Sequence, residues 1–364
     1  MNKADLKFMR RALELAKKEG RYTSPNPRVG AVIVRQGKIV GEGATRPYGG
    51  FHAEVVALKK AGSKAKGATL YVTLEPCAHY GKTPPCVDAI IRSGVKKVVA
   101  ALEDPFPLVS GQGFARLRQA GISVKVGLLE NEAAALNGTF LLSAQRGRPM
   151  VILKAAASLD GKIATVAGHS KWITGEKARR KTHEMRAQAD AILVGSRTAL
   201  LDNPSLTVRL PGWKRRDGWP LRVVLDSNLR SNPKWRLFQG EAKTVVFTSP
   251  KASRSKQKLL ERKGAFVFRV PSRGKVLSLK AVLRVLHSLQ VRLLLVEGGG
   301  EVHASFLEEK LADGAALFLS PKLLGGPAPT WVRGKGVENP DLAPYLKNIH
   351  IEPVGADLLL TGLF

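Results

Sequence analysis

The order of apolar and polar positions along the chain predicts strands and helices in alternation. Residues 5–18 carry apolar side chains at helical spacing, with Gly20 as a stop signal. Short apolar runs bounded by turn residues predict strands over residues 31–36, 38–43, 68–76, 96–105 and 122–129. Amphipathic stretches predict helices over residues 52–60, 86–94, 112–120 and 130–146. Strands separated by helices throughout predict a layered α/β sandwich.

The same alternation restarts after a short break. The segment QRGRP, residues 145–149, combines Gly and Pro at the end of a predicted helix and is the best domain boundary in the chain. Beyond it, apolar runs that predict strands begin near residues 150, 190, 221, 244 and 291. We therefore expect two domains, residues 1–146 and 147–364, each long enough to bury its own core.

A glycine triplet, Gly298 to Gly300, follows the last of these runs and precedes a helix expected over residues 303–310. Glycines at a strand-to-helix turn permit close backbone approach, and the start of a helix offers N–H groups to an anion. The spacing is not that of a dinucleotide-binding fingerprint. The pattern alone leaves open a tight turn or a phosphate cradle, and it favours the turn.

Composition narrows the class of protein. The 364 residues are 44% hydrophobic, which is typical of a globular protein, and no apolar run approaches the length that spans a bilayer. The N-terminal residues carry charges every few positions and lack the apolar centre of a signal peptide. The only two cysteines are expected to be free thiols, so we predict a cytoplasmic protein without a membrane partner.

The formal net charge of +30 has three explanations. A basic chain can bind nucleic acid, a positive field can concentrate small phosphorylated substrates, or the surface can simply be basic and highly soluble. Lys and Arg are spread along the chain without a block of five or six like charges, so the basic surface explains most of the excess. For the basic loop of residues 209–219 we favour a solvated insertion over a substrate lid, apart from Arg209.

The strongest chemical signal lies between residues 51 and 86. His52 and Glu54 form a His-Ala-Glu triplet, and the two cysteines, Cys77 and Cys86, follow nine positions apart, the first directly after a proline. One imidazole and two thiolates suit Zn²⁺, with a fourth position left to water. This order of residues, with the glutamate outside the metal shell, is typical of zinc deaminases that act on nucleobases. A structural zinc site is the alternative, but such sites usually close with four protein ligands.

Longer motifs resemble one family over essentially the whole chain. They are SPNPRVGAVIV, FHAEVVAL, TLEPCAHYGKTPPC, SLDGKIAT, SKWITG, RAQADAILVG, LRVVLDS, VEGGG and PKLLGG. Together they closely resemble the bifunctional riboflavin-biosynthesis deaminase–reductase. The wide spacing of Cys77 and Cys86 is part of this resemblance, because nucleic-acid and nucleoside deaminases typically have two residues between their cysteines. The resemblance implies a cytidine-deaminase-like α/β/α sandwich followed by a dihydrofolate-reductase-like α/β domain.

The resemblance implies two consecutive reactions on a small phosphorylated pyrimidine. In the first, zinc-dependent hydrolysis converts 2,5-diamino-6-(5-phosphoribosylamino)pyrimidin-4-one to 5-amino-6-(5-phosphoribosylamino)uracil, and ammonia leaves. In the second, NADPH reduces the ribosyl group to give 5-amino-6-(5-phosphoribitylamino)uracil. Zinc and NADPH are thus the implied cofactors, and no nucleic acid is expected as a partner. The sequence leaves the oligomeric state open, although the resembled family tends to form homo-oligomers.

The resemblance also assigns roles to individual positions. His52, Cys77 and Cys86 match the family's zinc ligands, and Glu54 matches its proton carrier. Substrate contacts are implied at Asn26, His79, Lys82, Asp104, Ser170, Arg186, Leu206, Arg209 and Glu297. NADPH contacts are implied at Ala156, Trp172, Thr198, Asp202, Ser227, Gly299, Gly300, Glu301, Val302, His303, Ala304 and Ser305. The two arginines suit a phosphate group, which a guanidinium binds bidentately. Lys154 and Asp202 are the candidates for the polar and proton-handling groups of the second site.

Two positions depart from the family's pattern. Thr45 stands where the family usually has a histidine before the His-Ala-Glu triplet, and Phe106 stands where it usually has an asparagine. Both departures bear on substrate contacts and leave the metal ligands intact.

Two alternatives to this function remain. A tRNA or other nucleic-acid deaminase is supported by the charge and by the zinc motif, but the cysteine spacing and the second domain count against it. A non-catalytic zinc-bound scaffold is disfavoured by the intact Glu54.

Overall fold

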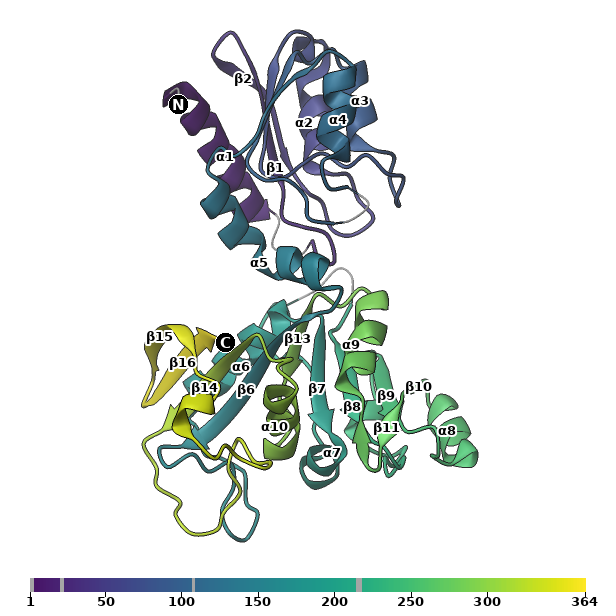
Figure 1. Cartoon of the computed structure of the whole chain (residues 1–364), viewed down its shortest axis with the longest axis vertical. Helices are drawn as coiled ribbons and strands as arrows, with labels where there is room; N and C mark the ends of the chain where they lie inside the picture. Colours follow the sequence, from purple (N-terminus) through teal and green to yellow (C-terminus); the bar gives the residue numbers. More distant parts are fainter. Residues whose placement is uncertain (1–2, 20–22, 107–108, 214–217) are drawn as a thin grey trace. The chain divides into compact units, whose positions relative to one another are not determined.

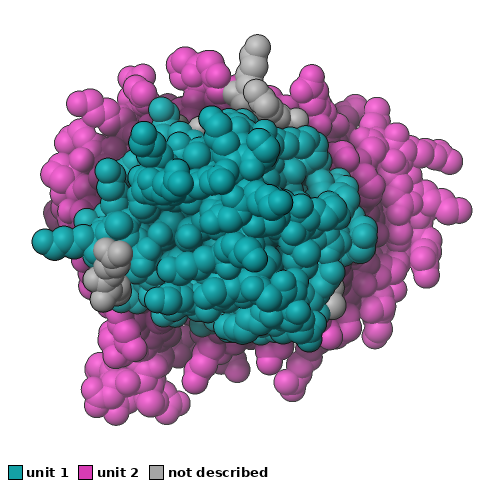
Figure 2. All heavy atoms as spheres, turned by 90° about the horizontal axis from the view of Figure 1, so that it is seen from above, with its two compact units in different colours: residues 1–147 teal, residues 148–364 magenta. Residues whose placement is uncertain are grey.

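The protein divides into two compact units, each with its own sheet and its own apolar core. The structure, a computed structural model, describes residues 3–19, 23–106, 109–213 and 218–364. Unit 1 is residues 1–147 and unit 2 is residues 148–364, coloured separately in Figure 2. The interpretation of the basic loop of residues 209–219 stays a prediction, because its residues 214–217 lie outside the described residues.

Unit 1 is built on a five-stranded sheet in the order β2-β1-β3-β4-β5. Its strands are β1 (Gly30–Arg35), β2 (Lys38–Ala44), β3 (Thr69–Val72), β4 (Lys97–Ala100) and β5 (Ser123–Lys125). β1 pairs antiparallel with β2 and with β3, whereas β3, β4 and β5 run parallel. The predicted hairpin is confirmed: β1 and β2 join through Gln36 and Gly37, both at positive φ, as a two-residue turn between twisted strands requires.

Helices cover both faces of this sheet, as Figure 1 shows. They are α1 (Lys3–Glu19), α2 (Ala53–Ala61), the short 3₁₀ helix η2 (Gly62–Ala65), α3 (Cys86–Arg92), α4 (Gln112–Gln119) and α5 (Glu130–Arg146). α1 and α5 lie on one face, and α2, α3 and α4 lie on the other. The predicted helices are confirmed to within two residues, but several strands are shorter than predicted. β3, for example, ends at Val72, because the chain leaves the sheet there to form the loop that carries Cys77.

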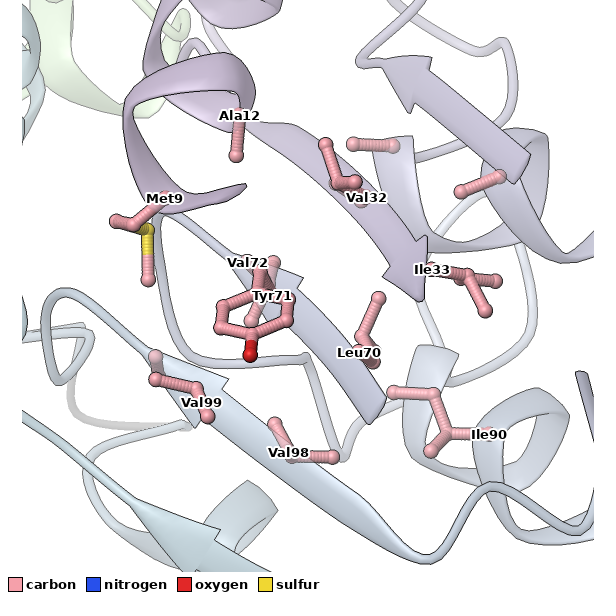
Figure 3. Close-up of a cluster of buried hydrophobic side chains, with 14 of the residues drawn as sticks. Met9, Ala12, Val32, Ile33, Leu70, Tyr71, Val72, Ile90, Val98 and Val99 are labelled. Carbon is pink, nitrogen blue, oxygen red and sulfur yellow. The ribbon is translucent and has the colours of Figure 1, made fainter. Parts of the chain in front are cut away.

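The core of unit 1 forms on both faces of its sheet (Figure 3). Val32 of β1 pairs with Tyr71 of β3, and Ile33 pairs with Leu70. Successive side chains of a strand point to opposite faces, so these two pairs line different faces. The first pair faces α1, since the ring centroid of Tyr71 lies 5.3 Å from that of Phe8. The second pair therefore faces the layer of α2, α3 and α4.

Unit 2 is built on a nine-stranded sheet in the order β10-β9-β8-β7-β13-β6-β14-β16-β15. The strands from β10 to β14 in this order run parallel, and β16 and β15 add an antiparallel hairpin at one edge. The strands are β6 (Met150–Ser158), β7 (Ala191–Gly195), β8 (Leu221–Leu225), β9 (Thr244–Thr248), β10 (Phe266–Arg269), β13 (Leu293–Val296), β14 (Gly314–Ser320), β15 (Lys347–Val354) and β16 (Asp357–Leu363). A separate ribbon consists of β11 (Ser272–Arg273) and β12 (Val276–Leu277).

Helices also pack on both faces of the larger sheet. They are α6 (Glu176–Gln188), α7 (Ser196–Asp202), α8 (Arg254–Glu261), α9 (Leu279–Ser288) and α10 (Gly300–Glu308), with the 3₁₀ helices η3 (Arg236–Phe238) and η4 (Pro340–Leu342). Neighbouring residues of β7 belong to different cores: Leu193 packs with α9, and Val194 packs with α7. None of the described helices is both long and apolar enough to cross a membrane.

The parallel strands of unit 2 bring polar residues together at one edge of the sheet. Leu153 of β6 and Leu193 of β7 both pair with Val296 of β13. The next residues therefore lie side by side: Lys154 within β6, Val194 within β7 and Glu297 directly after the end of β13. Open α/β sheets bind their ligands near the carboxyl ends of their strands, and β13 ends here.

Two isoleucine variants test the assignment of the unit 1 core. Ile33→Ala removes a fully buried side chain, whereas Ile39→Ala removes one that is 42% exposed on the neighbouring strand. We expect Ile33→Ala to lower the free energy of unfolding of unit 1 by about 2–5 kcal/mol, because it leaves a cavity. Ile39→Ala should cost much less. Urea denaturation followed by circular dichroism measures both, and equal losses would contradict the assignment.

Candidate active sites

Potential metal donors converge in unit 1. The Nδ1 atom of His52 lies 3.5 Å from the Sγ atom of Cys77 and 3.2 Å from the Sγ atom of Cys86. The three donor atoms all lie within 4.8 Å of one another. In a tetrahedral shell with Zn–S and Zn–N bonds of about 2.3 and 2.0 Å, neighbouring donors lie about 3.5 Å apart. The imidazole and the two sulfurs therefore fit a zinc ion, and they leave its fourth position open.

The local fold explains this convergence. His52 is the residue before α2, Cys77 follows the end of β3, and Cys86 is the first residue of α3. The backbone N–H of Val87 donates to the Cys77 carbonyl at 3.2 Å, and the N–H of Cys86 donates to the Cys77 sulfur at 3.4 Å. These bonds close the loop between the cysteines. The predicted placement of His52 and Cys86 at helix starts is confirmed.

The electrostatics of the site favour a thiolate before any metal binds. Hydrogen bonds from the Cys86 thiol and from His52 lower the pKa of the Cys77 thiol to about 4, although burial opposes the shift. The same coupling to Cys77 raises the pKa of the Cys86 thiol. A cation that binds here releases the second proton, because metal ligation requires both sulfurs as thiolates.

Glu54 lies beside the donor set without belonging to it. It is in the first turn of α2, two positions after His52, and it is only 3% exposed. Burial raises the pKa of its carboxyl to about 7, and the carboxyl hydrogen-bonds to the Cys86 thiol. A carboxyl with a pKa near neutrality can both accept and return a proton at physiological pH. This geometry supports the prediction of a proton carrier.

Two of the residues predicted to contact the deaminase substrate are near the cysteine thiols. His79 is near Cys77 in the sequence, and Asp104 is near it in space. His79 follows Cys77 by two positions, and its Nδ1 atom is buried with no hydrogen-bond partner among the described residues. Its ring centroid lies 6.3 Å from that of Phe106. Asp104 is buried, and burial, together with the charges of Glu75 and Cys77, raises the pKa of its carboxyl to about 7. His79 and Asp104 thus offer polar groups beside the donor set.

The other predicted positions of this pocket lie on separate loops. Asn26 is in the turn that precedes β1. Lys82 is exposed, and its ammonium lies 4.0 Å from the centroid of the Tyr48 ring. Thr45, which departs from the family's pattern, is buried, and its backbone N–H donates to the carbonyl of Val29. The substrate contacts at Asn26 and Lys82 stay predictions.

A second cluster of charged side chains lies in unit 2, where β6, α6 and β13 meet. Arg186 donates through Nε and Nη2 to the two carboxylate oxygens of Glu297, at 2.7 and 2.8 Å. Lys154 is enclosed beside this pair, and its ammonium lies 5.5 Å from the centroid of the Phe318 ring. Burial alone would raise the pKa of Glu297, but the charges of Arg186 and Lys154 lower it to about 2. Two cations face one carboxylate, so the cluster carries a net positive charge that attracts an anionic group.

The guanidinium of Arg186 has hydrogen-bond partners within the protein, and the phosphate contact expected of it stays a prediction. Glu297 takes the bidentate face of its guanidinium, and its Nη1 atom donates to the Thr207 carbonyl at 3.1 Å. Arg209 is exposed, and its backbone N–H donates to the ring of His183 at 3.2 Å. The guanidinium of Arg209 also has a protein partner, since its Nε atom donates to the His183 ring at 3.3 Å. The phosphate contacts expected of both arginines therefore stay predictions.

The glycine triplet forms a tight turn between β13 and α10. A Cβ atom on Gly298 would lie 2.6 Å from the Gly195 nitrogen, and one on Gly300 would lie 2.4 Å from the Thr330 carbonyl oxygen. The N–H of Gly299 donates to the hydroxyl of Thr198 at 3.1 Å. The close backbone approach predicted for these glycines is confirmed. The helix begins at Gly300, three positions before the predicted start at residue 303, because the last glycine already forms its first turn.

The remaining positions predicted for unit 2 differ in exposure. The hydroxyl of Ser170 donates to the carboxylate of Asp202 at 3.1 Å, and Trp172 is 62% exposed. Leu206, His303 and Ala304 are buried, so any ligand contact that they make involves backbone atoms or the position of α10. The other positions lie on β6, after β8 and on α10: Ala156, Ser227, Glu301, Val302 and Ser305.

Sequence reasoning missed one buried carboxylate beside the zinc donors. Glu75 lies two positions before Cys77 and accepts backbone N–H groups from the loop that carries Asp104. The available signal was an acidic residue placed directly after an apolar strand and before the Pro-Cys pair.

Known families match both units of the chain. Residues 2–102 match the family described as cytidine and deoxycytidylate deaminase zinc-binding region, and residues 149–360 match the RibD C-terminal domain. The riboflavin biosynthesis protein RibD of Aquifex aeolicus is 44% identical, over 98% of this chain and 97% of its own length. The protein of the same name from Escherichia coli is 42% identical, over 97% of both chains.

Solved structures agree with these matches. RibD from Acinetobacter baumannii has a TM-score of 0.89 at 37% identity, over 99% of both chains. A diaminohydroxyphosphoribosylaminopyrimidine deaminase/5-amino-6-(5-phosphoribosylamino)uracil reductase from Thermotoga maritima has a TM-score of 0.80 at 40% identity, over 98% of both chains. The fold class and the family predicted from the sequence are thereby confirmed. The chain therefore belongs to the RibD family, the bifunctional zinc- and NADPH-dependent deaminase–reductases of riboflavin biosynthesis.

Proposed function

We propose that residues 1–146 carry out the deamination and residues 147–364 the reduction. The observation that carries this division is the convergence of His52, Cys77 and Cys86 in unit 1, while the charged cluster around Lys154 lies wholly in unit 2. The first unit acts on 2,5-diamino-6-(5-phosphoribosylamino)pyrimidin-4-one. Its product, 5-amino-6-(5-phosphoribosylamino)uracil, is the substrate of the second unit, which forms 5-amino-6-(5-phosphoribitylamino)uracil.

In unit 1, the ligands His52, Cys77 and Cys86 hold the metal. When bound, zinc would act as a Lewis acid and lower the pKa of a water molecule. Glu54 takes a proton from the attacking water and returns it to the leaving amine, so that a hydroxyl replaces the amino group and ammonia leaves. Its pKa of about 7 suits both transfers. His79, whose Nδ1 atom has no hydrogen-bond partner among the described residues, is the proposed hydrogen-bonding group for the substrate.

In unit 2, NADPH supplies the hydride that reduces C1′ of the ribosyl group. The reduction also places a proton on the sugar oxygen that is released from C1′. Lys154 supplies this proton, because burial lowers the pKa of its ammonium and so makes the proton easier to give up. Glu297, fixed by Arg186, keeps Lys154 in place through its charge. Asp202, bonded to Ser170, is the second candidate for the proton donor.

The partner in this proposal is a small phosphorylated pyrimidine, and neither nucleic acid nor a membrane takes part. A nucleic-acid deaminase would leave the buried charges of unit 2 without a function. The proposed location is the cytoplasm, where free thiols such as Cys77 and Cys86 stay reduced. A homo-oligomer is the proposed assembly, on the basis of the family resemblance.

Glu54→Gln tests the division of labour. Ammonia release and the loss of NADPH absorbance are followed together with the pyrimidine substrate. We expect the variant to keep its zinc and to release ammonia about 10²–10⁴-fold more slowly, because it has lost the group that moves protons. NADPH oxidation with the deaminated intermediate should stay at the wild-type rate. Retained ammonia release, or loss of both activities together, would contradict the proposal.

Replacing both cysteines tests the metal ligands. The chain has no other cysteines, so the double variant that combines Cys77→Ala and Cys86→Ala has no thiolate left to bind the metal. We expect elemental analysis to find one zinc ion per chain in the wild type and none in the double variant, whose reductase activity should persist. Zinc that survives both substitutions would refute the assignment of the ligands.

Lys154→Met tests the proton donor of unit 2, with the exposed Lys243→Met as its control. The methionine fills a similar volume but carries no proton. We expect kcat for reduction of the deaminated intermediate to fall about 10²–10⁴-fold, because general acid catalysis is lost. NADPH affinity, measured by fluorescence quenching, should change little in either variant. A wild-type kcat for Lys154→Met would exclude this role.

A further inference from the structure

Glu75 fastens the loop after β4 to the segment that carries the zinc donor Cys77. The Glu75 side chain is buried, and its Oε2 atom accepts the backbone N–H groups of Asp104 at 3.2 Å and of Gly111 at 3.0 Å. Its Oε1 atom accepts the N–H of Phe114 at 3.2 Å. Hydrogen bonds to a carboxylate are roughly twice as strong as those between neutral groups. One side chain thus holds both ends of the loop and the start of α4.

Two further contacts hold α4 against the same segment. A Cβ atom on Gly113 would lie 2.1 Å from the Pro76 carbonyl oxygen, so only glycine allows the helix to come this close. Arg116, one turn farther along, donates to the Ala78 carbonyl at 2.9 Å and to the Asp88 carboxylate at 2.6 Å. Contacts from α4 therefore reach the residues directly before and directly after Cys77. They also reach α3, whose first residue is Cys86.

The loop held in this way carries two residues, Asp104 and Phe106, that connect Glu75 to His79. Asp104 donates its N–H to Glu75, and its own Oδ1 atom accepts the N–H of Phe106 at 2.9 Å. The ring centroid of Phe106 then lies 6.3 Å from that of His79. A continuous series of contacts thus runs from Glu75 through Asp104 and Phe106 to His79. Displacing the loop would move Asp104 and Phe106 relative to the zinc donors and would break the ring contact with His79.

We propose that Glu75 is a positioning residue for the deaminase. It sets residues 104–106, and residues 109–114 at the start of α4, at their distance from the zinc ligands. Glu75 touches neither the metal donors nor, in the proposed mechanism, the reacting atoms. Its loss therefore weakens binding of the pyrimidine substrate more than it slows the chemical step. The inference rests on the proposed deaminase site of unit 1.

Glu75→Gln is the test. The glutamine amide has nearly the same size as the carboxylate, but its N–H₂ group cannot accept a hydrogen bond from a backbone N–H. We expect the KM of ammonia release to rise about tenfold or more while kcat changes much less, the pattern of lost ground-state binding. Zinc content and NADPH oxidation with the deaminated intermediate should match the wild type. Hydrogen–deuterium exchange should become faster in peptides from residues 104–114. The matched control is Glu132→Gln, an exposed carboxylate on α5, which should change none of these quantities.

Arg116→Gln is a second variant, with Arg92→Gln, an exposed residue on α3, as its control. Arg116 is partly exposed, so its replacement leaves the core intact, and it should raise KM in the same way but by less. An unchanged KM in both Glu75→Gln and Arg116→Gln would overturn the proposal. A Glu75→Gln variant that loses both its zinc and its kcat would also overturn the proposal. If Glu75→Gln does not fold, an unchanged KM in Arg116→Gln alone would overturn it. Absence of ammonia release from the wild type would instead count against the proposed function.

Discussion

The arrangement of unit 1 depends on one requirement: an imidazole and two thiols from different segments must meet at bonding distance from a single ion. The antiparallel and parallel strands of the sheet end so that α2 and α3 start beside each other, which places His52 and Cys86 together, and the loop after β3 brings Cys77 to them. The apolar core on both faces of the sheet fixes these starting points. The same crowding buries Glu54, so the environment that gathers the ligands also brings the pKa of the proton carrier close to neutrality.

Unit 2 brings three charged side chains together in its interior. Lys154 in β6 and Glu297, directly after β13, follow a pair of residues that lie opposite each other in these strands, and α6 adds Arg186. Burying three charges is costly unless they are paired and hydrogen-bonded, and the bidentate contact between Arg186 and Glu297 meets that condition. The remaining cation, Lys154, is left with a lowered pKa in an enclosed position. The three glycines that follow β13 have no side chains. The turn into α10 can therefore pack directly against the end of β7.

Much of this could be predicted from local pattern. The helix of residues 130–146 and the hairpin at Gln36 and Gly37 follow from apolar periodicity and turn residues alone. The zinc donors were recognisable because chemistry allows few residue types in that order. Long-range contacts were not recognisable. The pairing of Arg186 with Glu297 joins residues 111 positions apart, and no local pattern indicated it. Glu75 gave only a weak signal, because a carboxylate after a strand looks like any polar loop residue until its backbone partners, such as Gly111, are known. The ends of strands were predicted poorly for a related reason: Leu74 packs in the core of unit 1 although β3 ends before it, at Val72.

Zinc K-edge X-ray absorption of the metal-replete protein tests the central claim most directly. An open site held by His52, Cys77 and Cys86 predicts two sulfur neighbours at about 2.3 Å, one imidazole nitrogen at about 2.0–2.1 Å and one further oxygen from water. A shell of four protein donors would identify a structural zinc site instead. A shell without sulfur would show that the ion binds elsewhere, and either result would contradict the account.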